Sequence, residues 1–104
     1  MAIIYNKLVR DKIPQIIEAS GKKAVTRVAD DTEYLDCLRR KLSEEVQEYL
    51  TSGDVEELAD ILEVVSALGR CAGASTDQLI GIAADKREAR GGFDERILLL
   101  RVED

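Results

Sequence analysis

The segment from Lys41 to Val65, KLSEEVQEYLTSGDVEELADILEVV, restricts the fold more than any other part of the chain. Its apolar residues recur every three or four positions, which is the spacing of one face of an α-helix, and TSGD interrupts the pattern once. The pattern predicts two long helices, over about residues 32–50 and 54–70, joined by a tight turn. The same segment is densely acidic, so these helices must supply a core and carry many negative charges at once.

Shorter helices are predicted on both sides of this pair. Residues 11–20 place Pro14 in a first helical turn and are followed by Gly21, a residue that suits a left-handed helix end. Near the C-terminus, Ser75 and Gln78 have the spacing of a capping box, in which each residue satisfies a backbone N–H of the other. This spacing predicts a further helix that ends before the interruption RGGF.

Two segments remain outside these helices. KKAVTRVADD predicts a loop or short extended segment that ends in a helix cap at Asp30, with Glu33 three residues later. ERILLLRV, near the C-terminus, is short and apolar, and it is compatible with a strand-like arm or with a last helical turn. We therefore expect one all-α domain over residues 1–104, a helical bundle built around the central antiparallel helix pair.

The length and the charge limit the function. A chain of 104 residues and 11.5 kDa can build one modest core but no deep cavity walled on every side, so self-association is expected. Fifteen Lys and Arg against twenty-one Asp and Glu give a formal charge of −6, which disfavours binding to nucleic acid. The chain has no run of about 18 apolar residues, and its N-terminal apolar piece is too short for a signal peptide. These features predict a soluble, cytoplasmic protein without a membrane partner.

The chain contains no histidine. A Ser–His or Cys–His nucleophile pair, an imidazole general base and a His-containing zinc site are therefore excluded. The two cysteines, Cys37 and Cys71, lack metal-ligand spacing and fall within helical patterns, so we expect small buried side chains rather than a disulfide. Hydrolytic chemistry would have to use carboxylates, lysines, tyrosines or a hard metal ion.

Two acidic pairs in the long helices share one internal spacing: Glu45 with Glu48, and Glu57 with Asp60. Residues three apart lie on one helical face, so each pair can direct both carboxylates to one point, and antiparallel packing would bring the pairs together. A solvated acidic face is the usual explanation for such a spacing. Glu57 also has a structural alternative, as the third residue of a helix capped by Asp54.

A helical wheel favours the functional interpretation. Glu57 falls in line with Val64, and Asp60 lies beside Val64 and Ala67, whereas Glu45 falls among the apolar positions of the first long helix. The polar face of the second long helix is predicted at Glu56, Glu63 and Ser66. Like charges beside a core require protonation or a cation. A set of oxygen ligands suits Mg²⁺, with Mn²⁺ as a substitute.

Cations for an anionic substrate occur at both ends of the chain. YNKLVRDK lies near the N-terminus and DKREARGG near the C-terminus, and the candidate substrate-binding residues are Lys7, Arg10, Lys86 and Arg90. Each of them alone is most often a solvated surface charge. Arg can hold phosphate oxygens in a fork and Lys acts as a point charge. The glycine pair after Arg90 would let backbone N–H groups approach an anion closely.

These motifs resemble those of a known family. EExxE at Glu44, Glu45 and Glu48, followed by ExxD at Glu57 and Asp60, is similar to the MazG-type signature of the all-α nucleoside triphosphate pyrophosphohydrolases. The opening YNKLVRDKIPQII and the close DKREARGGF resemble the phosphoribosyl-ATP pyrophosphohydrolase-like branch of this family. The resemblance covers nearly the whole chain.

The resemblance implies both a fold and an activity. The two central helices would pair with those of a second subunit in a four-helix arrangement, and a nucleotide would be hydrolysed between its α- and β-phosphates. The Mg²⁺-binding positions would be Glu45, Glu48, Glu57 and Asp60. Glu44 would hold or activate water, so the candidate catalytic residues are Glu44, Glu45 and Glu48. Phosphate contacts would come from Lys86 and Arg90, and from Lys7 and Arg10.

The sequence therefore predicts a Mg²⁺-dependent nucleotide pyrophosphohydrolase that yields a nucleoside monophosphate and pyrophosphate. A homodimer is the expected assembly, with a homotetramer as the alternative. Two other interpretations stay open: a phosphoribosyl-ATP pyrophosphohydrolase, and a non-catalytic helical dimer that serves as a binding or regulatory module. Base and sugar preference depend on pocket shape, which the motifs do not specify.

Overall fold

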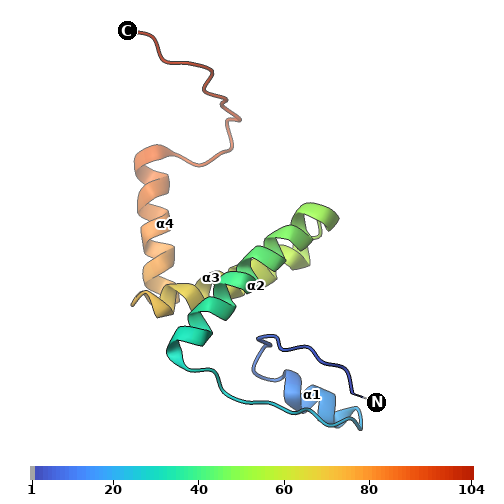
Figure 1. Cartoon of the computed structure of the whole chain (residues 1–104). Helices are drawn as coiled ribbons and strands as arrows, with labels where there is room; N and C mark the ends of the chain where they lie inside the picture. Colours follow the sequence, from blue (N-terminus) through green and yellow to red (C-terminus); the bar gives the residue numbers. More distant parts are fainter. Residues whose placement is uncertain (1) are drawn as a thin grey trace.

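The computed structural model describes residues 2–104 and is all-helical in that range (Figure 1). Its four helices are α1 (Ile13–Ala19), α2 (Asp31–Ser52), α3 (Val55–Cys71) and α4 (Thr76–Arg90). Residues 2–104 contain no strand, and none of their helices has the length and apolar composition needed to cross a membrane. The prediction of an all-α fold is confirmed, and each of the four predicted helices forms within a few residues of its expected bounds.

The centre of the fold is a hairpin of α2 and α3, which lie side by side along most of their length (Figure 1). The turn between them is short because Gly53 adopts φ 70°, a left-handed conformation that glycine enters without a side-chain clash. Its N–H donates to the carbonyl oxygen of Tyr49 at 2.7 Å, which ends α2. The tight turn makes the two helices antiparallel, as TSGD predicted.

Two of the predicted helix caps are present. Asp30 accepts a hydrogen bond from the backbone N–H of Glu33 at 2.9 Å, at the start of α2. The capping box of α4 is complete, because Ser75 Oγ accepts from the Gln78 N–H at 3.1 Å and Gln78 Oε1 accepts from the Ser75 N–H at 2.8 Å. These bonds satisfy N–H groups that have no partner within the helix.

The predicted cap at the start of α3 is wrong. The Asp54 side chain makes no capping hydrogen bond; instead the Asp54 backbone N–H donates to Ser52 Oγ at 3.1 Å. The short turn places the serine hydroxyl beside this N–H, and the first turn of α3 closes through a backbone bond from Glu57 to Asp54 at 3.2 Å. The Glu57 side chain is therefore not used in a capping box.

The core of the single chain is small. Leu38 from α2 and Val64 and Ala67 from α3 are its buried apolar residues within the described range, which confirms the predicted core-facing side of α3. Partly buried residues pack against them: Leu8, Tyr34, Leu42 and Leu68. Leu8 lies in the N-terminal segment, residues 2–12, so this segment is held against the hairpin.

One side of the hairpin exposes apolar residues. Val46 and Leu50 of α2, and Leu58 and Leu62 of α3, are all exposed, Leu62 by 66%. On a helical wheel at 100° per residue, each of these side chains lies away from the α2–α3 interface, and the direction of rotation about the helix axis is the same for both helices. Because the helices are antiparallel, rotations of the same sense lead toward the same side of the hairpin. We call these four residues the apolar side of the hairpin.

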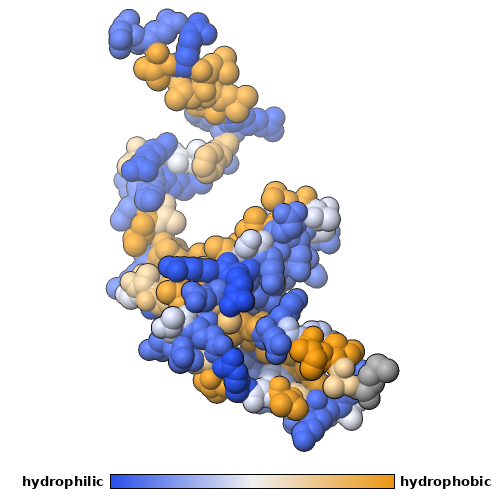
Figure 2. Space-filling model, in the orientation of Figure 1, coloured by the Kyte–Doolittle hydropathy of each residue, from blue (hydrophilic) through white to orange (hydrophobic). Residues whose placement is uncertain are grey.

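The C-terminal part of the chain projects from the hairpin (Figure 1). α4 contacts α3 but no other helix of the described chain, and residues 91–104 extend beyond it without regular structure. Figure 2 shows hydrophobic surface on this extension, where Ile97–Leu100 are more than three-quarters exposed. ERILLLRV is thus an extended arm rather than a last helical turn.

Two side chains differ in burial from their predictions. Ser66 was predicted on the polar face of α3 but is buried; it lies three residues from Gly69, where α4 packs. A Cβ at Gly69 would lie 3.3 Å from Leu79 Cδ2 of α4. Cys71 was expected to be buried but is exposed at the end of α3, whereas Cys37 is half-buried, and both thiols are free.

Candidate metal centre

Three carboxylates from the two helices of the hairpin converge. Glu45 of α2 and Glu57 and Asp60 of α3 each offer one oxygen, and these oxygens lie within 4.8 Å of one another. We call these three residues the carboxylate cluster. At about 1.5 Å per residue, Glu45 and Asp60 are at similar heights above the turn, so antiparallel packing brings them level. The spacing of the two acidic motifs thus determines the convergence.

Burial distinguishes this cluster from a solvated acidic face. Glu45 is only 7% exposed, and its Oε2 atom is buried without a hydrogen-bond donor. Glu57 Oε2 is likewise buried without a partner. A buried carboxylate oxygen that has lost water and found no donor is costly, and most such groups in proteins have a partner. Two of them at one point, from different helices, form a site that either a cation or a proton could satisfy.

The local environment raises the pKa of both Glu45 and Glu57 above the ordinary value of 4.5. For each carboxyl the largest cause is burial, which disfavours the charged form, followed by the nearby carboxyl group of Glu48, whose charge repels theirs. Glu48 is therefore close enough to interact with both carboxyls, although it lies outside the group of three. A proton or a nearby positive charge would therefore stabilise these two carboxyl groups.

Protein cations balance this charge only in part. Arg10 Nη2 lies 2.6 Å from Asp60 Oδ1, and Lys41 Nζ lies 3.6 Å from Glu45 Oε1. With Glu48 included, four carboxylates face two cations at ion-pair distance. The remaining negative charge suits a divalent cation with oxygen ligands. In an octahedral site adjacent ligand oxygens are about 3 Å apart and opposite ones about 4 Å, so small side-chain rotations bring the cluster into range.

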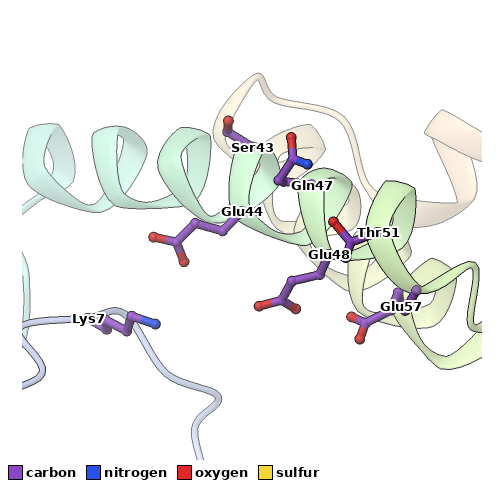
Figure 3. A pocket seen from close by; sticks show the side chains of 8 residues that line it. Lys7, Ser43, Glu44, Gln47, Glu48, Thr51 and Glu57 are labelled. Carbon is purple, nitrogen blue, oxygen red and sulfur yellow. The ribbon is translucent and has the colours of Figure 1, made fainter.

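A groove open to solvent lies beside the cluster and has a volume of about 630 Å³. Figure 3 shows Glu44, Glu48 and Glu57 directed toward the side on which Lys7 of the N-terminal segment lies. Polar residues of α2 complete the lining: Ser43, Gln47, Thr51 and Ser52. The groove therefore has an acidic wall from the hairpin and a cationic side chain opposite.

The predicted site residues divide into two groups. The structure brings together three of the four predicted metal ligands, and Glu48 lies beside them on the groove wall. Glu44 and Lys7 line the same groove, and Arg10 pairs with Asp60. Lys86 and Arg90 are on α4, which contacts α3 alone, and neither lines the groove or pairs with a cluster carboxylate. Within one chain they do not join the site.

Sequence reasoning missed three features of the site. Lys41 precedes Glu45 by four residues, a spacing that places both side chains on one face, and this signal was readable. Ser43, Gln47 and Thr51 also recur every fourth residue on α2, which marks a polar stripe beside the acidic one. Leu8, which holds the N-terminal segment on the core, had no comparable signal.

Comparison with known proteins gives limited information. No family model matches the chain, and no solved structure matches it. A stretch of 53 residues, 51% of this chain, is 47% identical to an uncharacterized protein of Mycolicibacterium smegmatis. The match covers 53% of that protein, so the chain spans about half the length of the curated relative that it matches.

Proposed function

We propose that this protein is a divalent-cation-dependent nucleotide pyrophosphohydrolase, which cleaves between the α- and β-phosphates to give a nucleoside monophosphate and pyrophosphate. The observation that carries the proposal is the pair of buried carboxylate oxygens, on Glu45 and Glu57, that have no hydrogen-bond donor. They belong to a cluster with an excess of negative charge. The resemblance of EExxE and ELAD to the MazG-type signature supports the same activity.

The donor set favours Mg²⁺ or Mn²⁺. Every ligand in the cluster is a carboxylate oxygen, and the chain has no histidine that would favour zinc or copper. Glu45, Glu57 and Asp60 would hold the ion, with Glu48 as a fourth ligand. When bound, the ion would neutralise phosphate charge and act as a Lewis acid on the phosphate oxygens.

The groove supplies the other parts of such a site. Its volume of about 630 Å³ lies within the range of small-molecule sites, which is about 300–1,000 Å³. Lys7 can hold phosphate oxygens as a point charge. Glu44 is exposed on the groove wall, so it can orient a water molecule and accept its proton as that water attacks phosphorus. Pyrophosphate would then leave toward the solvent-open side of the groove.

The proposal includes a homodimer. The apolar side of the hairpin (Val46, Leu50, Leu58 and Leu62) exposes four large apolar side chains, and the core of one chain is small, so a second copy that covered them would be stabilising. Packing this side against its counterpart would give the four-helix arrangement that the family resemblance implies. A second subunit could also bring Lys86 and Arg90 near a groove that they do not reach in their own chain. A homotetramer is the larger assembly that the same apolar surfaces would permit.

The proposed activity is tested by incubating the protein with Mg²⁺ and a panel of nucleoside and deoxynucleoside triphosphates and phosphoribosyl-ATP, and measuring pyrophosphate. We expect release from at least one substrate that stops on addition of EDTA and returns with Mg²⁺. Preference for phosphoribosyl-ATP would assign the narrower activity. No pyrophosphate from any substrate, with the protein folded and Mg²⁺ bound, would contradict the proposal and leave a non-catalytic binding module.

A further inference from the structure

The N-terminal segment is joined to the carboxylate cluster by one ion pair. Arg10 Nη2 donates to Asp60 Oδ1 at 2.6 Å, across a sequence separation of 50 residues. Leu8 packs on the core two residues earlier, and the Arg10 carbonyl oxygen accepts a hydrogen bond from the Ile13 N–H at 3.0 Å, at the start of α1. The backbone on both sides of Arg10 is therefore held, and its side chain reaches a residue that the proposed function assigns to the cation.

We propose that Arg10 is a displaceable counter-ion, which occupies Asp60 in the metal-free protein and competes with the divalent cation for it. The proposal rests on the proposed function, because it takes Asp60 as a metal ligand. The unpartnered Oε2 atom of Glu45, which is 7% exposed, independently indicates that a cation belongs at this point. Arg10 thus neutralises one carboxylate of the cluster and leaves the two buried oxygens unsatisfied.

The pair is suited to exchange. The Arg10 side chain is 56% exposed and that of Asp60 41%, so water can replace either partner, and exposed pairs of this kind contribute little stability. A divalent ion at the cluster would repel the guanidinium and take the carboxylate oxygen. Because Lys7 lies on the same segment and lines the groove, the released guanidinium would join it beside the phosphates of a nucleotide.

Coupling of this kind is reciprocal. If Arg10 weakens cation binding, then the cation must weaken the docking of the N-terminal segment by the same free energy. In the wild-type protein, cation binding should therefore increase the mobility of the N-terminal segment. In a variant that lacks the guanidinium, cation binding should leave the mobility of this segment unchanged. Neither measurement requires enzymatic activity.

The test is Mn²⁺ binding by titration calorimetry, with hydrogen exchange of residues 2–12 measured with and without Mn²⁺. For Arg10→Gln we expect Mn²⁺ to bind more tightly than to wild type, by up to about fivefold, since an exposed ion pair is worth up to about 1 kcal/mol. Exchange of residues 2–12 should rise on Mn²⁺ addition in wild type, and should be high and insensitive to Mn²⁺ in the variant.

The matched control is Arg27→Gln, because Arg27 also forms a 2.6 Å pair with a carboxylate, Glu33, but outside the cluster. It should bind Mn²⁺ as wild type does. Unchanged or weaker Mn²⁺ binding by Arg10→Gln, or exchange in residues 2–12 that ignores Mn²⁺ in wild type, overturns the inference alone. Absence of Mn²⁺ binding in every protein overturns it together with the metal site. The expected Mn²⁺ results without pyrophosphate release would support this inference and contradict only the proposed activity.

Discussion

Replacing Glu57 by glutamine is expected to reduce pyrophosphate release by at least about 100-fold, because changes in the outer shell of a metal site alone cost about 10–100-fold. The same change should raise the melting temperature of the metal-free protein at neutral pH. Glu57 has a buried oxygen without a donor, and it is repelled by neighbouring carboxylates, so a neutral amide removes an unfavourable charge. Loss of activity together with a gain in stability is typical of a charged residue that binds a ligand and destabilises the fold when the ligand is absent.

The stability gain should depend on pH. The folded state raises the pKa of Glu57 above 4.5, so it binds the proton more tightly than the unfolded chain does. Protonation therefore favours folding: this stabilisation is fully present below about pH 4.5 and is lost as the pH rises through the folded-state pKa. Glu57→Gln should exceed wild type in melting temperature at about pH 8 and lose that advantage near pH 4.5.

Glu56→Gln is the matched control, because it makes the same chemical change at the exposed neighbouring position of α3. It should leave both activity and the pH dependence of stability near wild-type values. Full activity of Glu57→Gln would contradict the ligand assignment. A melting temperature of Glu57→Gln below that of wild type, at about pH 8 in EDTA, would contradict the claim that the charge of Glu57 destabilises the metal-free fold.

Replacing Leu62 by glutamate is expected to weaken self-association by at least about 100-fold. In one chain Leu62 is 66% exposed, so the substitution should be tolerated if the protein is a monomer. In the proposed dimer each copy would bury its leucine, which is worth about 1.5–3 kcal/mol per side chain, and about 1.4 kcal/mol corresponds to a tenfold change in affinity. Sedimentation equilibrium measures the dissociation constant directly.

Val28→Glu provides the control for this experiment. Val28 is 96% exposed in the segment before α2, away from the apolar side of the hairpin, so its replacement should not change the assembly. Identical association of Leu62→Glu and wild type would show that the apolar side is not the interface. A loss of association by both variants would show that added negative charge alone dissociates the protein.

The hairpin and the convergence of its acidic residues could be predicted from the sequence because both depend on short-range spacing. The apolar period defines α2 and α3, TSGD requires a tight turn, and the ExxE and ExxD intervals then bring Glu45 level with Asp60. The helix caps show that short-range spacing alone does not always predict the structure. Ser75 and Asp54 have equally good spacings, but only Ser75 caps its helix, because the geometry of a two-residue turn decides the other case.

Features that depend on contacts between distant segments could not be predicted in this way. Arg10 and Asp60 are 50 residues apart, and no local pattern pairs one arginine of the N-terminal segment with one particular carboxylate. The burial of Ser66 likewise depends on packing against other parts of the chain, which a wheel drawn for one helix does not contain. One chain does not bring Lys86 and Arg90 to the groove, so their role as phosphate contacts stays a prediction.

The central claim is that Glu45, Glu57 and Asp60 are held close together for a divalent cation. The most direct measurement is the anomalous diffraction of crystals grown with Mn²⁺, which locates the ion without reference to activity. We predict a peak within about 2.5 Å of carboxylate oxygens from all three residues, the range expected for oxygen ligation. A fully ordered hairpin with no peak at this cluster, at Mn²⁺ concentrations that saturate binding in solution, would contradict the account.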